Sequence, residues 1–202
     1  MVFEALRQSR RRCDLLQRRR LLQLGLGALA GAGVSAGLGA PVAWAEAIHT
    51  AGEPRTITMH NLNTGQKLEA LYWYRGAYVP DALDAVNKLM RDHRTGAQYP
   101  IDPKLLDLLV TLHARTEATV CYELICGYRA PETNAAMHRK SRQVASNSLH
   151  VQGMAADVRI GGQPLATLQT AALALRGGGV CLYPRSDFVH LDVGPVRQWK
   201  GS

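Results

Sequence analysis

The residues best suited to chemistry are two histidines and one aspartate in the last third of the chain. His150 and Asp157 lie seven residues apart in the segment SLHVQGMAAD, and the glycine between them permits a tight turn. The loop histidine can therefore approach an aspartate on the following strand. In the strand expected from Met154, Asp157 alternates with apolar neighbours, and a carboxylate in such a stretch needs a cation.

A second segment, FVHLD, supplies the third residue. Phe188, His190 and Asp192 share one face of the expected strand, while the residues between them pack behind it. Two imidazoles, one carboxylate and an open fourth position are what a catalytic zinc ion requires. Neutral nitrogens with one oxygen also favour zinc over magnesium or calcium. We therefore predict a zinc site made of His150, Asp157 and His190.

The elements that position these residues follow from the periodicity of the sequence. Helices are expected to come first and most strands last, with no βαβ repeat, so we predict an α+β fold with a small antiparallel sheet and flanking helices. The expected strands cover residues 55–62, 67–74, 119–126, 154–160, 179–183 and 188–193, of which the first two form a hairpin. The expected helices cover residues 81–94, 103–114, 132–138 and 165–176, with a turn at 127–131 and a polar loop over 139–148.

The first 45 residues have the layout of an export signal. Arginines at positions 18–20 precede an uncharged run rich in Leu, Ala and Gly, and Ala43 and Ala45 supply the small residues that a signal peptidase reads. The arginine pair resembles a twin-arginine (Tat) signal, so we expect export by the twin-arginine translocase, cleavage after Ala45 by signal peptidase, and a periplasmic protein. An uncleaved membrane anchor is the alternative, because the run is long enough to span a bilayer.

The positive charge of the chain is concentrated in this signal. Seven of the 24 Lys and Arg residues lie in the first 20 positions, so removal of residues 1–45 takes away +5 of the net charge of +8. The remaining charge near +3 argues against a nucleic-acid partner.

Three cysteines remain after the signal. Cys121, Cys126 and Cys181 form no CxxC pair and so do not predict a zinc site. Cys121 and Cys126 are five residues apart in a strand-like run and should point to opposite faces, so at most one of them can meet Cys181. One bridge with a free thiol, and buried apolar cysteines without a bridge, both remain open.

Three motifs together resemble a known family. Residues 148–157 match the SxHxxGxAxD motif of the D-Ala-D-Ala carboxypeptidase family of zinc peptidases, GYRAP at 127–131 resembles its GYR(S/A)P element, and FVHLD resembles its closing HxD. The stretch from about Arg55 to Trp199, including YPRS at 183–186, resembles the subgroup typified by murein endopeptidase K. This resemblance implies a hedgehog/D-Ala-D-Ala peptidase-like domain over residues 55–202, behind a flexible leader at 46–54.

The resemblance also implies roles for individual residues. It assigns zinc binding to His150, Asp157 and His190, contact with the substrate or an oxyanion to Arg129, and a supporting hydrogen bond to Ser148. An arginine suits this role because its guanidinium stays charged and can face a developing oxyanion.

The general base departs from the family pattern. Carboxypeptidase relatives place a Glu three residues before the last histidine ligand, or a His two residues before it, and these positions are Asp187 and Phe188 here. Asp187 is a shorter carboxylate at the Glu position. Asp192 is a second candidate for the base, and alternatively it orients a ligand imidazole.

The expected function is that of a periplasmic zinc peptidase that hydrolyses the peptide cross-links of peptidoglycan, which is its expected partner. Two alternatives stay open. A D,D- or L,D-carboxypeptidase acting on stem peptides needs a closed pocket, and the sequence lacks a clear cap insertion for one. A non-catalytic, zinc-stabilised cell-wall-binding module would explain the missing Glu or His.

Overall fold

The computed structural model describes residues 53–141 and 144–201. The predicted signal at residues 1–45 and nearly all of the predicted leader at 46–54 lie outside these residues. Within the part of the chain that is described, no helix is both long enough and apolar enough to cross a membrane.

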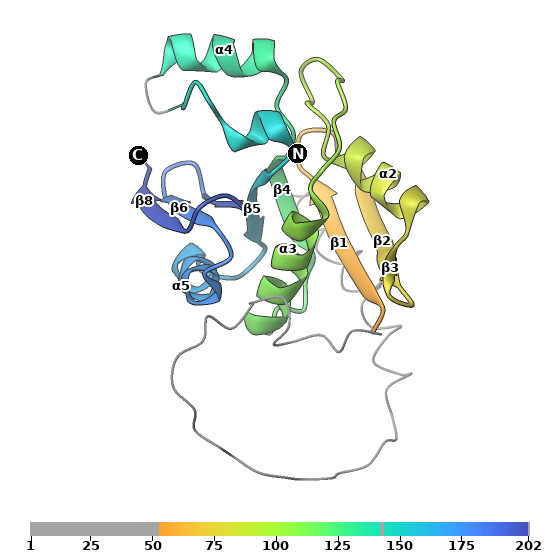
Figure 1. Cartoon of the computed structure of the whole chain (residues 1–202). Helices are drawn as coiled ribbons and strands as arrows, with labels where there is room; N and C mark the ends of the chain where they lie inside the picture. The colour runs from red at the N-terminus through yellow and green to blue at the C-terminus, as the bar shows by residue number, and fades with distance from the viewer. Residues whose placement is uncertain (1–52, 142–143, 202) are drawn as a thin grey trace. The chain divides into compact units, whose positions relative to one another are not determined.

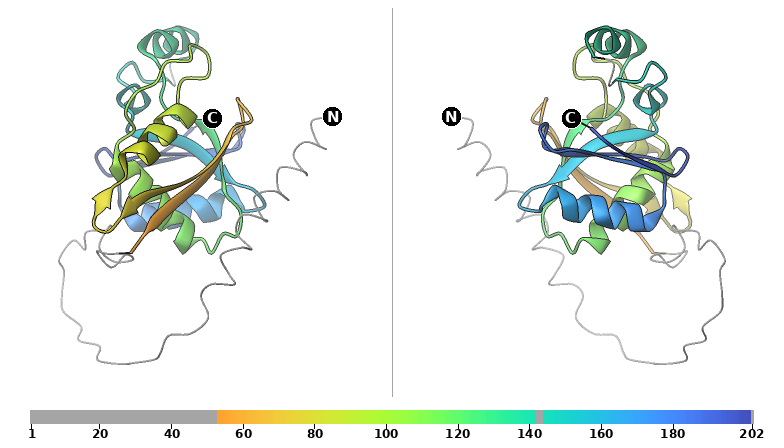
Figure 2. Two further views of the ribbon diagram at one scale, coloured as in Figure 1. Left: turned by 90° about the vertical axis from the view of Figure 1, so that its right-hand side faces the viewer. Right: turned by 90° about the vertical axis from the view of Figure 1, so that its left-hand side faces the viewer.

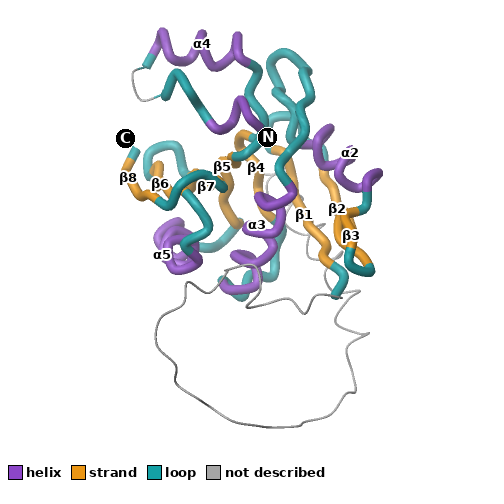
Figure 3. The backbone as a smooth tube through the Cα atoms, viewed as in Figure 1, coloured by secondary structure: helices purple, strands orange, loops and turns teal. Residues whose placement is uncertain are grey.

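The domain is built on one eight-stranded sheet with the strand order β3-β2-β1-β4-β5-β7-β6-β8 (Figures 1 and 3). Among the described residues, three helices contact the sheet, and a further helix, α4, lies above the ends of the strands in Figure 1. The strands are β1 (Arg55–Asn61), β2 (Lys67–Tyr74), β3 (Ala77–Tyr78), β4 (Tyr122–Cys126), β5 (Ala155–Ile160), β6 (Gly179–Tyr183), β7 (Phe188–Asp192) and β8 (Arg197–Lys200). The helices are α2 (Pro80–Leu89), α3 (Pro103–Arg115), α4 (Pro131–Lys140) and α5 (Leu165–Leu175), with a 3₁₀ turn η1 (Leu149–Gln152).

The hydrophobic core lies between the sheet and the helices α2, α3 and α5 (Figure 2). Asp102 caps α3 by accepting a hydrogen bond from the Lys104 amide, and Pro103 occupies its first turn. A stripe of leucines forms the inner face of this helix, and each member is fully buried and contributes about 1.5–3 kcal/mol relative to exposure. The stripe consists of Leu105, Leu106, Leu109 and Leu112.

The predicted α+β class is confirmed, but the sheet is mixed and larger than expected. β1 pairs with β4 in parallel, and β6 pairs with β8 in parallel, while the other pairs are antiparallel. The chain between β1 and β4 passes through α2 and α3, and such a crossover returns a strand in the same direction. The expectation of a purely antiparallel sheet was therefore wrong, and the short strands β3 and β8 were not expected at all.

The helix expected over residues 81–94 ends earlier, at Leu89. The Asp92 side chain accepts hydrogen bonds from the amides of Arg94 and Thr95, which gives the backbone a turn in place of another helical turn. Asp92 also accepts from the Ala130 amide at 2.8 Å, so this turn anchors the GYRAP segment.

Candidate metal centre

Three neighbouring strands place polar side chains side by side on the sheet face that the core does not use. Asp157 on β5 is the register partner of His190 on β7, and Cys126 on β4 is the partner of Asp157. Directly paired residues project from the same face. The adjacent pair, Val158 and Val189, faces the core instead.

His150 reaches this row from the η1 turn because Gly153 reverses the chain behind it. Gly153 has φ +67°, and a Cβ atom there would lie 2.1 Å from the Pro100 carbonyl oxygen. Only glycine satisfies both conditions without strain. The tight turn predicted between His150 and Asp157 is thus confirmed.

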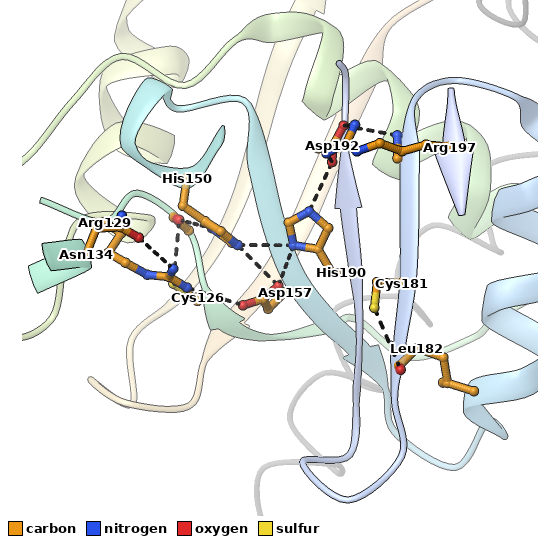
Figure 4. Close-up of polar contacts among 12 residues, drawn as sticks. Cys126, Arg129, Asn134, His150, Asp157, Cys181, Leu182, His190, Asp192 and Arg197 are labelled. Carbon is orange, nitrogen blue, oxygen red and sulfur yellow. Dashed lines mark hydrogen bonds and ion pairs between the residues drawn. The ribbon is translucent and has the colours of Figure 1, made fainter. Parts of the chain in front are cut away.

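The three predicted ligands converge on one point (Figure 4). His190 Nδ1 lies 2.9 Å from Asp157 Oδ1, and His150 Nε2 lies 3.3 Å from the same oxygen. The two imidazole nitrogens are 3.2 Å apart. All three residues are buried. The structure therefore brings together the set that the sequence predicted.

The outer nitrogen of each imidazole has a partner that fixes the tautomer. His150 Nδ1 lies 2.7 Å from the Gly127 carbonyl, which can only accept, so this nitrogen carries the proton. His190 Nε2 lies 3.1 Å from Asp192 Oδ2 and donates to it in the same way. In the neutral imidazoles the inner nitrogens are then acceptors, and they face the acceptor oxygen of Asp157. Three converging acceptors require a cation among them.

The arrangement fits zinc. Tetrahedral coordination with Zn–N and Zn–O bonds of about 2.0–2.1 Å places neighbouring ligand atoms about 3.3 Å apart, close to the three separations observed here. Without an ion the site must hold protons instead. Burial opposes charge on both His150 and Asp157, but their attraction prevails, raising the pKa of His150 and lowering that of Asp157.

Asp192 holds the His190 ring from the side opposite Asp157. It is fully buried, and its carboxylate accepts from the amides of Gly179 and Gly194 and from both terminal nitrogens of Arg197. Burial alone would raise the pKa of Asp192, but the hydrogen bond with His190, together with those from Arg197 and the two amides, lowers it to about 2. This geometry supports the predicted role of Asp192 in orienting the His190 imidazole. It also places the Asp192 carboxylate on the side of the ring that faces away from Asp157 and His150.

Arg129 is placed beside the ligands by the GYRAP turn. A Cβ atom at Gly127 would lie 2.6 Å from the Met90 carbonyl oxygen, so glycine lets this turn pack tightly on the end of α2. The buried guanidinium of Arg129 lies 3.9 Å from Asp157 and donates to Asn134 at 3.2 Å. Its Nε has no partner among the described residues.

Comparisons with known proteins agree with this geometry. The family model described as "Peptidoglycan L,D-endopeptidase MepK" matches residues 49–199. The chain belongs to this family. It is 42% identical over 150 residues to the "Probable peptidoglycan L,D-endopeptidase MepK" of Haemophilus influenzae, covering 74% of this chain and 81% of the relative. It is 38% identical over 182 residues to the peptidoglycan L,D-endopeptidase MepK of Escherichia coli K12, covering 90% and 96%. No solved structure gives a significant match.

The other predicted site residues are placed differently. Ser148 is buried and lines the pocket beside His150. Asp187, at φ +56°, has a largely exposed side chain that pairs with Arg159 and is not part of the pocket lining. Its role as general base, like that of Asp192, stays a prediction.

The point at which His150, Asp157 and His190 converge opens into a pocket of about 540 Å³. Its walls come from segments far apart in the sequence, including the end of β4, the loop after α4, η1 and strands β7 and β8. Arg94, Arg129 and Arg197 contribute positive charge to the walls, and Tyr183, Phe188 and Trp199 contribute aromatic surface.

One residue of the site was missed by the sequence analysis. Cys126 lies with His150 and Asp157 in a cluster whose ligand atoms are all within 4.8 Å of one another. Both Cys126 and Cys181 are free thiols, so the bridge to Cys181 that was left open does not form. Cysteine spacing gave no signal, because the cluster depends on strand register.

Proposed function

We propose that this chain is a periplasmic, zinc-dependent peptidoglycan L,D-endopeptidase. The observation that carries the proposal is the convergence of three acceptor atoms, from His150, Asp157 and His190, at separations of 2.9–3.3 Å. Membership of the family and the names of its relatives support the reaction and the substrate.

The pocket suits a peptide that carries carboxylates. Stem peptides of peptidoglycan are anionic, and the three arginines that line the pocket give it a positive wall. The aromatic side chains beside them supply apolar surface for the aliphatic parts of the peptide.

Each residue of the centre has a distinct task in the proposed reaction. His150, Asp157 and His190 would hold the zinc ion, whose chemistry when bound is to polarise the scissile carbonyl and lower the pKa of a water toward about 7. Arg129 holds a permanent positive charge beside the reacting carbonyl, where it stabilises a developing oxyanion. Asp192 keeps Nδ1 of His190 deprotonated and aimed at the centre.

The compartment is also part of the proposal. The layout of residues 1–45 supports export by the twin-arginine translocase with cleavage after Ala45, and peptidoglycan lies outside the cytoplasm. Fractionation of cells that express the full chain tests this point. Retention of uncleaved protein in the cytoplasm would contradict it, and so would dependence of export on a pathway other than the twin-arginine translocase.

Digestion of purified, cross-linked peptidoglycan by the zinc-loaded protein tests the reaction. We expect cross-linked dimers to disappear and the product masses to correspond to cleavage of an L,D bond. The His190→Ala variant should leave the dimers intact, whereas His113→Gln, a change on α3 outside the pocket, should act like the unmutated protein. Intact dimers in all three samples would contradict the proposal, and release of single terminal residues would indicate a carboxypeptidase.

A further inference from the structure

A β-bulge turns Cys126 toward the metal centre. The register of β4 against β5 shifts between Leu124, which pairs with Val158, and Cys126, which pairs with Asp157. Leu124 and Val158 face the core. In a regular strand Cys126 would face the core as well, because it is two residues after Leu124. The extra residue, Ile125, places the thiol on the face of Asp157, and bulges often redirect a side chain in this way beside active sites.

The thiol lies near two of the three predicted ligands, His150 and Asp157. The Sγ atom of Cys126, one ring nitrogen of His150 and one oxygen of Asp157 all lie within 4.8 Å of one another. Tetrahedral zinc needs about 3.6 Å between a thiolate sulfur and a neighbouring nitrogen or oxygen ligand. A shift on the order of 1 Å therefore suffices for the sulfur to coordinate an ion together with His150 and Asp157, and a side-chain rotation can supply it.

The sulfur lies among polar groups of the pocket, with a guanidinium close by. It lies 3.7 Å from the carbonyl oxygen of Gly127 and 3.6 Å from Nη2 of Arg129, and it also interacts with the His150 side chain. A guanidinium beside a sulfur stabilises the thiolate, which is the form that binds metals. Cys126 is also only half-buried and lines the same pocket as the three predicted ligands.

We propose that Cys126 is a fourth protein ligand of the metal ion, so that the resting centre has two nitrogens, one oxygen and one sulfur. The inference rests on the proposed metal centre but assigns it a ligand beyond the two histidines and the aspartate. Zinc accepts such a mixed set because it is a borderline-soft ion that binds thiolate, imidazole and carboxylate. Substrate or water must then either displace the sulfur or enter as a fifth ligand.

Cobalt(II) tests this assignment without reference to activity, because a thiolate ligand adds a sulfur-to-cobalt charge-transfer band in the near ultraviolet to the visible bands of a tetrahedral ion. We expect this band when the full chain binds cobalt. The Cys126→Ser variant should keep the visible bands and lose the charge-transfer band. Its metal affinity, measured by competition with a chelator, should fall by at least about 10-fold, since even outer partners of ligands have effects of that size.

Cys181 provides the matched control. It is the other free thiol of the described residues, it lies across from His190 in the register of β6 and β7, and it is not part of the cluster. Cys181→Ser should leave the charge-transfer band unchanged. Circular dichroism of each variant checks that it is folded.

The outcomes separate this inference from the proposed function. Visible bands of bound cobalt without a charge-transfer band, in the unmutated protein, would overturn the role of Cys126 and leave the three-ligand centre standing. Loss of the band in Cys181→Ser but not in Cys126→Ser would overturn it as well. Failure of the folded protein to bind cobalt or zinc at all would overturn both the inference and the metal-dependent function.

Discussion

Asp107 and Asp157 are both buried aspartates surrounded by polar groups. The groups around Asp107 are hydrogen-bond donors, whereas those nearest Asp157 are nitrogens that act as acceptors in the neutral imidazoles. Asp107 accepts from Arg55 Nη1 at 2.7 Å and from the hydroxyls of Tyr72 and Tyr78 at 2.9 Å each. Burial and this carboxylate raise the pKa of both tyrosines, that of Tyr78 to about 12, so both remain donors. The Asp107 cluster, made of these four residues, is thus a set of donors around one acceptor.

Asp157 has the reverse surroundings. In the neutral imidazoles, the nearest atoms of His150 and His190 are acceptors, because their outer nitrogens donate to Gly127 and Asp192. Arg129, the one permanent cation in contact among the described residues, is as far as 3.9 Å away. A buried charged cluster therefore does not by itself indicate a site, since the Asp107 carboxylate is supplied with donors from within the protein. An excess of converging acceptors does indicate one.

The largest expected effect comes from neutralising Asp157. Asp157→Asn replaces a charged ligand with a neutral amide, and we expect hydrolysis of cross-linked peptidoglycan to fall by about 1000-fold, because metal catalysis contributes several kcal/mol. Muropeptide analysis with a fixed zinc concentration measures this. Activity within tenfold of the unmutated protein would contradict the difference drawn between the two aspartates.

Asp107→Asn should lower the stability of the protein and leave its zinc binding unchanged. Removal of one partner from a buried ion pair costs about 3 kcal/mol, so we expect a lower free energy of unfolding in urea denaturation. The folded fraction should still bind zinc with unchanged stoichiometry, because Asp107 is remote from the pocket lining. Loss of zinc binding by the folded variant would show that the Asp107 cluster also serves the site.

Asp192→Asn sharpens the account of the metal centre. It weakens the hydrogen bond that fixes the His190 tautomer, and we expect zinc affinity to fall by about 10-fold to 100-fold. Arg197→Gln leaves the Asp192 carboxylate in place and removes the guanidinium that donates to it, so it should have a smaller effect in the same chelator competition. An equal or larger effect of Arg197→Gln would show that the arginine acts on the site directly.

The pH dependence of zinc binding should reveal the raised pKa of His150. Zinc must displace the proton of this residue, so affinity should keep rising above pH 6.5 by up to about tenfold per pH unit, where an ordinary histidine would level off. The metal-free protein should show the opposite trend. Its stabilisation by charged His150 is fully present below about pH 6.5 and is lost as the pH rises through the folded-state pKa. Affinity that levels off near pH 6.5 would contradict the coupling to Asp157.

Asp187→Asn should have the smallest effect and tests the remaining base assignment. The Asp187 side chain is 62% exposed and pairs with Arg159, so this change removes an exposed ion pair worth little to stability. We expect the rate of hydrolysis to change by less than about tenfold, below the lower range of general-base effects. A loss of about 100-fold or more in kcat would establish Asp187 as the base and require a movement of its turn.

Local pattern was sufficient for most elements and for the three predicted ligands. The glycine between His150 and Asp157 predicts the turn, and the alternation of side chains around His190 predicts the strand face. Both signals lie within a few residues of the ligands. The family motifs lie in those same short segments. Elements with weak local signals were missed, namely β3 with its two residues and β8 after a turn, because their pairing with distant strands stabilises them.

The sequence by itself determined the α+β class, the predicted ligand set, the family and an expected export signal, because each is indicated by local periodicity or by a motif of a few neighbouring residues. Only the tertiary structure decided which groups surround those ligands. It paired Asp187 with Arg159, turned Asp192 toward Arg197, and brought Cys126 to the metal centre through a bulge. The physical reason is strand register, because a one-residue shift moves a side chain to the other face of a sheet, and register depends on partners distant in the sequence.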